Sequence, residues 1–248
     1  MDRAKLLQEI SYKEKDDVFV VNTPTAISAN KTVKKILENY TDSKTAFFIS
    51  GGNTPKKLYE EIALEKTLKV GAALMVDERF GEKMHKKSNE LMLKDSGLLA
   101  YFEEQNIRFY PILQKDEGLE STALQYDETL RFLFKYFPKS VGILGLGGDG
   151  HTAGIPAIPE ISKRILEDQS LLVTNYADES GKYGARITMT YLALSQLDLI
   201  LILVLGQDKR EMLSQVFRGD SIEEMPGRFF KTPEMSKKTI LITDQIVS

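Results

Sequence analysis

The stretch "VGILGLGGDGHTAGIP", residues 141–156, decides the fold class. Its apolar start runs directly into a glycine-rich turn that carries Asp149 and His151. Apolar runs that do not alternate with polar residues are typical of strands buried on both faces, as in a parallel sheet covered by helices. We therefore expect a strand over 141–147 and, after it, a loop at the ligand-binding edge of an α/β sheet.

The rest of the chain repeats the same alternation of short apolar runs and longer amphipathic stretches. Further strands are predicted at 17–21, 45–50, 72–77, 170–174, 197–206 and 239–243, and helices at 25–40, 55–66, 121–137 and 207–219. This alternation predicts a three-layer α/β/α, Rossmann-like fold with a mostly parallel open sheet, as a single domain over residues 1–248. The segments 50–55, 77–79 and 147–151 each follow a predicted strand, so we expect them on one rim.

Composition and charge exclude several classes of protein. A net charge of −3 gives no basic field for nucleic acid, and the chain has no cysteine for disulfides, thiolate metal sites or nucleophilic catalysis. The beginning of the chain lacks the apolar core of a signal peptide, and the apolar run 197–206 is too short to span a bilayer. We expect a cytoplasmic protein without a nucleic-acid or membrane partner.

Three glycines in the deciding stretch, Gly145, Gly147 and Gly150, have the G-x-G-x-x-G spacing of a dinucleotide-binding loop. That loop requires a helix that opens at the third glycine and an acidic residue at the end of the next strand. Pro156 and Pro159 disfavour an immediate long helix here. The glycines are better explained by a tight turn that lets a ligand approach the backbone.

Asp149 and His151 are the candidate catalytic residues. A carboxylate two residues from an imidazole can hold one tautomer and leave the other nitrogen free to accept a proton. The alternative is that His151 only packs or caps the turn. The second histidine, His85, lies in a charged segment and is expected to be solvated. Two ligands are too few for a metal site, so none is predicted.

A second candidate site is the loop between the strand at 45–50 and the next helix. Thr54 is predicted to cap a helix that begins at Pro55. Free backbone N–H groups and the helix dipole would form a phosphate cradle there, although a plain strand-to-helix turn remains an alternative. The residues of this candidate cradle are Ser50, Gly51, Gly52, Asn53 and Thr54.

Charged residues elsewhere on the rim are open to two explanations. Asp77, Glu78 and Arg79 directly follow a predicted strand, and they either solvate its end or face a ligand. Arg186 binds either an anion or a neighbouring acid. Lys209 opens a helix, where a cation opposes the dipole. An anionic partner would explain it, and the alternative is the usual case of a solvated lysine.

Taken together, these segments resemble the 6-phosphogluconolactonase family. "SGGNTPKKLYE", "DER", "SN", "LGLGGDGHTAG", "RITMT" and "GQDKREML" occur in the family's order, over roughly residues 20–245. The related glucosamine-6-phosphate deaminases share the S-G-G-x-T-P loop and the D-G-H turn. They differ in having D-E-Y where this chain has Arg79 as the third residue, and a glutamate where it has Pro156. Both differences favour the lactonases. The chain departs from the lactonase pattern at Asn53, at Gly154 and in one missing residue before Pro156.

The resemblance implies hydrolysis of 6-phosphoglucono-δ-lactone to 6-phosphogluconate without a metal or organic cofactor. His151 would activate water and Asp149 would orient it. The partner is a small sugar phosphate, and the chain is expected as a monomer or homodimer. Deaminase-type chemistry and a non-catalytic sugar-phosphate module remain alternatives. The expected substrate-binding residues are Ser50, Gly51, Gly52, Asn53, Thr54, Asp77, Arg79, Ser88, Asn89, Gly148, Arg186 and Lys209.

Overall fold

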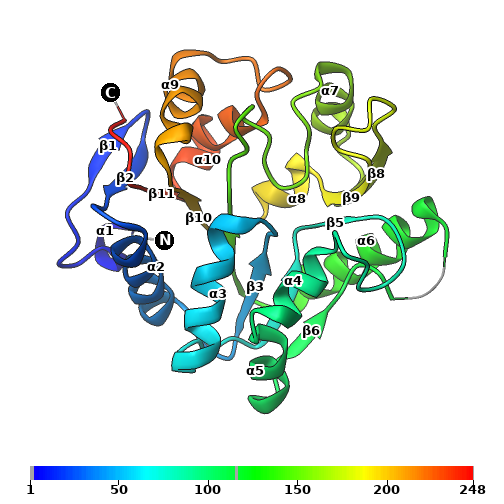
Figure 1. Cartoon of the computed structure of the whole chain (residues 1–248), viewed down its shortest axis with the longest axis horizontal. Coiled ribbons are helices and arrows are strands. Elements are labelled where there is room, and N and C mark those ends of the chain that lie inside the picture. Colours follow the sequence, from blue (N-terminus) through cyan, green and yellow to red (C-terminus); the bar gives the residue numbers. More distant parts are fainter. Residues whose placement is uncertain (1–2, 115–116, 248) are drawn as a thin grey trace.

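The computed structural model describes residues 3–114 and 117–247, and its dominant element is a large, mostly parallel sheet flanked by helices (Figure 1). The strands, in spatial order, are β1 (Lys13–Lys15), β2 (Val18–Asn22), β11 (Thr239–Thr243), β10 (Leu199–Val204), β7 (Lys139–Leu144), β3 (Thr45–Ile49), β4 (Ala72–Met75) and β6 (Arg108–Tyr110). All neighbours are parallel except β1 and β2. The predicted fold class is therefore confirmed. The central strands β3, β10 and β11 are buried at every position, as their apolar sequences predict.

Helices cover both faces of this sheet because its crossovers run in two directions. The connections β2–β3, β3–β4 and β4–β6 step one way across the sheet, and β6–β7, β7–β10 and β10–β11 step the other way. Right-handed crossovers therefore place the first group of helices on one face and the second group on the other. The first group is α2 (Ala26–Tyr40), α3 (Asn53–Glu65), α4 (Asn89–Asp95) and α5 (Leu98–Glu104), which lie side by side in Figure 1. The second group includes α6 (Leu119–Tyr136), α8 (Tyr191–Ser195), α9 (Arg210–Arg218) and α10 (Pro233–Ser236).

A second, three-stranded antiparallel sheet was not expected from the sequence. It consists of β5 (Asp77–Arg79), β9 (Ala185–Met189) and β8 (Val173–Ala177). The strand predicted at 72–77 is in fact two strands in different sheets, with only Val76 between them. The backbone N–H of Val76 donates to Ile49 of the large sheet (2.9 Å), and its carbonyl accepts from Met189 of the small sheet (3.0 Å).

Several predicted boundaries need correction. The strand expected at 170–174 is β8 (Val173–Ala177), in the small sheet, and β7 ends at Leu144 rather than at Gly147. The helix predicted from Pro55 starts at Asn53, so Gly52 and not Thr54 is its N-cap. The helix predicted at 207–219 is a short 3₁₀ turn, Gln207–Lys209, followed by α9. In each case the propensity pattern is right but the hydrogen-bond pattern shifts the end of the element.

The order of the strands places a crevice between β3 and β7. These strands are neighbours, but the chain leaves them in opposite directions across the sheet. Doubly wound sheets bind ligands outside the carboxyl ends of strands at such a switch point. The loop 50–52 follows β3 there, and the turn 145–151 follows β7. The loop after β3 is tied to β7 just before that turn, since the N–H of Ser50 donates to the carbonyl of Ile143 (3.2 Å).

Candidate active site

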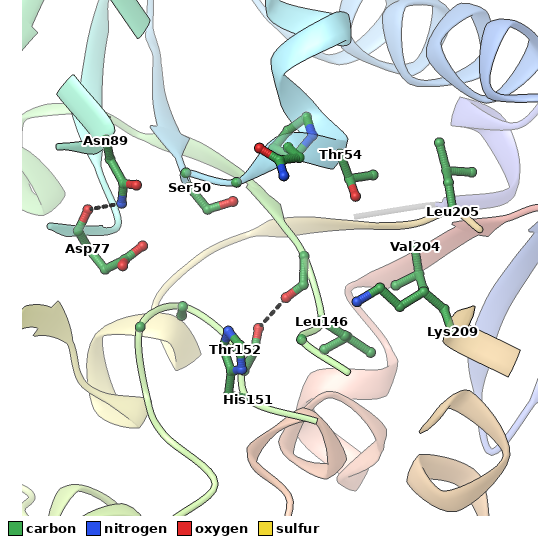
Figure 2. A pocket seen from close by; sticks show the side chains of 18 of the residues that line it. Ser50, Thr54, Asp77, Asn89, Leu146, His151, Thr152, Val204, Leu205 and Lys209 are labelled. Atoms are coloured by element: carbon green, nitrogen blue, oxygen red, sulfur yellow. Dashed lines mark hydrogen bonds between the residues drawn. The ribbon is translucent and has the colours of Figure 1, made fainter. Parts of the chain in front are cut away.

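A cavity of about 420 Å³ opens at this switch point (Figure 2). It is lined by the loops after β3, β7 and β10, by β5 and β9 of the small sheet, and by the start of α4. The predicted site residues that line it are Ser50, Gly51, Gly52, Asn53, Thr54, Asp77, Arg79, Asn89, His151, Arg186 and Lys209. Residues far apart in the sequence are thus brought together around one space. The predicted site residues Asp149, Gly148 and Ser88 do not line this cavity.

The turn after β7 fixes the position of His151. Gly147 donates its N–H to the carbonyl of His151 (2.8 Å), and Gly150 donates to the carbonyl of Gly147 (3.0 Å). Gly150 has a φ of +81°, a conformation that side-chain-bearing residues rarely adopt. The Thr152 hydroxyl donates to the carbonyl of Gly145 (2.9 Å), an interaction drawn in Figure 2. The glycines therefore close a tight turn around the histidine. No helix opens at Gly150, so the dinucleotide-binding alternative is excluded.

Asp149 holds the imidazole of His151 in a defined orientation. Its Oδ1 lies 2.6 Å from Nδ1 of His151 and also accepts the backbone N–H of the same residue (3.2 Å). A carboxylate can only accept, so Nδ1 carries a proton, and in the neutral imidazole the lone pair is then on Nε2. Figure 2 shows the ring at the border of the cavity. The arrangement can present Nε2 as a proton acceptor.

Asp149 remains ionised in this environment. Burial alone would raise the pKa of its carboxyl, but hydrogen bonds from His151, Lys182 and Tyr183 outweigh burial and hold the pKa well below its usual range. Both Lys182 Nζ and the Tyr183 hydroxyl donate to Oδ2, on the side of the carboxylate that faces away from His151. The negative charge is therefore available to stabilise a protonated imidazole.

The opposite part of the cavity is built to accept an anion. Gly52 caps α3 with a φ of +113° and without a side-chain hydrogen bond, so backbone N–H groups of the first turn of this helix have no intrahelical partner. Ser50 Oγ is buried and has no hydrogen-bond partner in the described part of the chain. Lys209 points into the same space (Figure 2), and its closest acid, Asp208, is 3.9 Å away. Helix dipole, free donors and an ammonium group together favour a negatively charged ligand.

The third wall of the cavity is a polar network on β5, β9 and α4. Arg186 Nη1 pairs with Asp77 Oδ2 at 3.1 Å, so Arg186 has the neighbouring acid that was one of its two explanations. Asn89 donates to the carbonyl of Asp77 (2.9 Å), as Figure 2 shows, and its amide oxygen accepts from Arg79. Gly51 packs against Asn89 so closely that a β-carbon at Gly51 would lie 1.9 Å from Oδ1.

Two sequence expectations are corrected at this wall. Ser88, expected to bind substrate, instead caps α4 by accepting the N–H of Leu91 (3.1 Å) and donates to the buried carboxylate of Glu78 (2.9 Å). His85, expected to be solvated, is half-buried, with Nε2 3.0 Å from the carbonyl of Arg79. Through these bonds both residues tie the segment between β5 and α4 to β5.

Sequence reasoning named Glu78 only as a charge at a strand end, and it missed Lys182 and Tyr183. Glu78 accepts hydrogen bonds from three backbone N–H groups and from Ser88, and burial raises its pKa against them. Lys182 and Tyr183 contact Asp149 from the β8–β9 connection. Only the glycines that flank this Lys-Tyr pair, at 181 and 184, hinted at a tight turn there.

Within 3–114 and 117–247, no three or more His, Asp or Glu side chains cluster in a way that would hold a metal ion. Over the same residues, every helix is too short or too polar to cross a membrane.

The fold and the cavity define the class of this protein. It is a doubly wound α/β protein in which His151, held by Asp149, and a candidate anion-binding loop, residues 50–54, lie at one cavity at the switch point of its sheet. Residues 22–240 match the family described as Glucosamine-6-phosphate isomerases/6-phosphogluconolactonase. The chain belongs to this family.

Individual relatives agree with this assignment. The 6-phosphogluconolactonase of Nostoc sp. is 32% identical over 193 residues, which cover 74% of this chain and 76% of the relative. The 6-phosphogluconolactonase of Pseudomonas putida is 32% identical over 189 residues, which cover 73% of this chain and 74% of the relative. The crystal structure of a 6-phosphogluconolactonase from Shewanella baltica has a TM-score of 0.78 at 22% identity and covers 94% of this chain and 99% of its own. This last likeness concerns the fold.

Proposed function

We propose that this protein hydrolyses 6-phosphoglucono-δ-lactone to 6-phosphogluconate. The observation that carries the proposal is the placement of His151, anchored by Asp149, in the same cavity as the anion-binding loop and Lys209. Family membership and the names of the relatives support the same reaction. The proposal makes the cavity the substrate site, with the phosphate at the loop and the lactone carbonyl at the histidine.

In this scheme His151 acts first as a base and then as an acid. Nε2 takes a proton from a water molecule as its oxygen attacks the lactone carbonyl, and the resulting oxyanion collapses with cleavage of the bond to the ring oxygen. The protonated imidazole returns its proton to that departing oxygen. Asp149 stabilises the imidazolium between the two steps and does not itself change protonation. The scheme uses no cofactor.

Substrate binding is assigned to the rest of the lining. Backbone N–H groups of the loop 51–54, the Thr54 hydroxyl, Ser50 Oγ and Lys209 are proposed to hold the phosphate. Asn53 is proposed to meet the sugar hydroxyls, together with the one N–H of the Asn89 amide that is not donated to Asp77. Arg79 and Arg186 already have protein partners, Asn89 and Asp77, so we assign them to shaping the cavity wall. A phosphate fixed at one end places the carbonyl for attack at the other.

The proposal is tested by hydrolysis of freshly generated 6-phosphogluconolactone, with the uncatalysed reaction and His151→Asn as references. We expect a clear enzymatic rate that falls to background in the variant, while thermal unfolding shows that the variant is folded. A wild-type rate equal to the uncatalysed reaction would refute the proposal. A fully active His151→Asn protein would refute the assigned base.

The same preparation separates the alternatives. Ammonia release from glucosamine 6-phosphate would indicate deaminase chemistry, which we do not expect, because the buried Pro156 occupies the position of the deaminase glutamate. Thermal stabilisation by 6-phosphogluconate without hydrolysis of the lactone would indicate a binding module without catalysis.

A further inference from the structure

We propose that Tyr183 is a positioning residue of this active site, which acts through Asp149 to orient His151. The inference rests on the proposed function, because it assigns Tyr183 a part in the same hydrolysis. Its basis is that Tyr183 contacts Asp149, His151 and the loop that follows them.

The hydroxyl of Tyr183 makes two of these contacts. It donates to Oδ2 of Asp149 and accepts the backbone N–H of Ala157 (3.3 Å). With Oδ2 held in this way, Oδ1 is directed at Nδ1 of His151. A carboxylate anchored at both oxygens has one orientation, so the histidine that it holds also has one orientation.

The ring of Tyr183 makes the third contact. It meets the imidazole of His151 edge to face, with ring centroids 5.4 Å apart and an interplanar angle of 87°. This packing restricts rotation of the imidazole about its bond to the chain. Tyr183 therefore limits the histidine both directly and through Asp149.

Hydrogen bonds and glycine conformations fix the turn that presents Tyr183. The N–H of Tyr183 donates to Oδ2 of Asp178 (2.8 Å), and the N–H of Gly181 donates to the carbonyl of the same aspartate (3.1 Å). Gly181 and Gly184 have φ values of +75° and +69°, which permit the tight connection between β8 and β9. The tyrosine thus comes from a turn closed by its own hydrogen bonds.

Lys182 also donates to Oδ2 of Asp149, but the two neighbours differ in burial. The Lys182 side chain is 60% exposed, whereas Tyr183 is only 7% exposed. Solvent weakens an exposed ion pair, and a flexible lysine loses entropy when it is held in place. The buried hydroxyl of Tyr183 is therefore the donor that determines the orientation of Asp149.

The first test is the kinetics of Tyr183→Phe, which keeps the ring and removes the hydroxyl. We expect kcat to fall about tenfold with KM nearly unchanged, since one hydrogen bond to a charged group is lost and the phosphate contacts remain. Tyr191→Phe is the matched control, because it removes another buried tyrosine hydroxyl, bonded to Ser162 (2.8 Å), with no contact to Asp149. Lys182→Gln should lower kcat less than Tyr183→Phe. An unchanged kcat in Tyr183→Phe would overturn the proposal.

The second test does not depend on activity. The chain has only two histidines, so the imidazole resonances of ¹⁵N-histidine-labelled protein can be assigned with a His85→Gln variant. In the wild type we expect a proton on Nδ1 of His151 and a nuclear Overhauser effect between its ring and that of Tyr183. In Tyr183→Phe the Nδ1 proton should shift and exchange faster with solvent. Absence of the wild-type ring contact, or an unchanged Nδ1 proton in the variant, would refute the positioning role. Failure of the lactonase proposal appears separately, as a wild-type protein without lactone hydrolysis.

Discussion

The imidazole of His151 lies against the backbone of Gly147, where a β-carbon would come within 2.0 Å of Nδ1. The glycine therefore provides space for the side chain that carries the proposed chemistry, and not for a nucleotide. Gly147→Ala should push the imidazole away from Asp149. Because a misplacement of about 1 Å can cost about 100-fold in rate, we expect kcat to fall by about that factor. Steady-state kinetics on the lactone measures it.

The control for this substitution is Gly118→Ala. Gly118 precedes α6 with a φ of −66°, and a β-carbon there would lie 3.7 Å from its nearest neighbour, Ser121 Oγ. That variant should keep wild-type kinetics. Equal kcat values for Gly147→Ala and the wild type would mean that the turn has room which the structure does not show.

Lys209 is expected to contribute to binding rather than to the chemical step. Lys209→Met should raise KM about 10- to 100-fold and change kcat little, because a hydrogen bond from a charged group is lost far from the lactone carbonyl. Lys163→Met, on the exposed face of α7 (Pro159–Glu167), is the matched control and should behave as the wild type. A fall in kcat at constant KM would instead assign Lys209 to the reaction step.

The lowered pKa of the Asp149 carboxyl predicts that the stability of the protein depends on pH. Its pKa is lower in the folded protein than in the unfolded chain, so its ionised form stabilises the fold above the unfolded pKa, and this contribution is lost as the pH falls. Asp149→Asn should therefore destabilise the protein more at about pH 6 than at about pH 3. Denaturant unfolding of both proteins at the two pH values gives the difference. A difference that grows toward low pH would contradict the environment described for this carboxyl.

Removing only one partner of the Asp77–Arg186 ion pair should strongly lower the free energy of unfolding. Both side chains are largely buried, with exposures of 7% and 12%. Arg186→Met leaves a buried carboxylate without its partner, which costs about 3–5 kcal/mol of the free energy of unfolding. The double variant Asp77→Asn/Arg186→Met should be more stable than Arg186→Met alone. Denaturant unfolding of the four proteins completes the cycle, and additive effects would show that the two side chains are not coupled.

Much of the fold was predictable because the sequences of its central strands are almost entirely apolar. β10 and β11 are apolar at nearly every position, and both strands were found in the large parallel sheet. The small sheet was not predictable for a physical reason. β5 has the sequence Asp-Glu-Arg, and its carboxylates are buried only because donors from α4 and β9 surround them. Nothing local in three charged residues indicates a strand.

Part of the candidate site was likewise predictable from the sequence, and part was not. The turn around His151 and the loop around Gly51 follow apolar strands, so sequence placed them on one rim, and the structure brings both to one cavity. The start of α3 was misplaced because Thr54 and Pro55 form a good capping signature, whereas Gly52 already has the φ that lets the helix begin earlier. Tyr183 was missed because its contact with Asp149 spans 34 positions and depends on how the small sheet packs.

The single residue between the two sheets has a mechanical consequence. Val76 is fully buried and is hydrogen-bonded to β3 on one side and to β9 on the other. Rotation of one sheet against the other would break one of these bonds in a place that water cannot reach to replace it. The bonds of this residue therefore resist rotation of the two sheets against each other, and the amide protons of Val76 and Met189 should be among the slowest in the molecule to exchange with solvent.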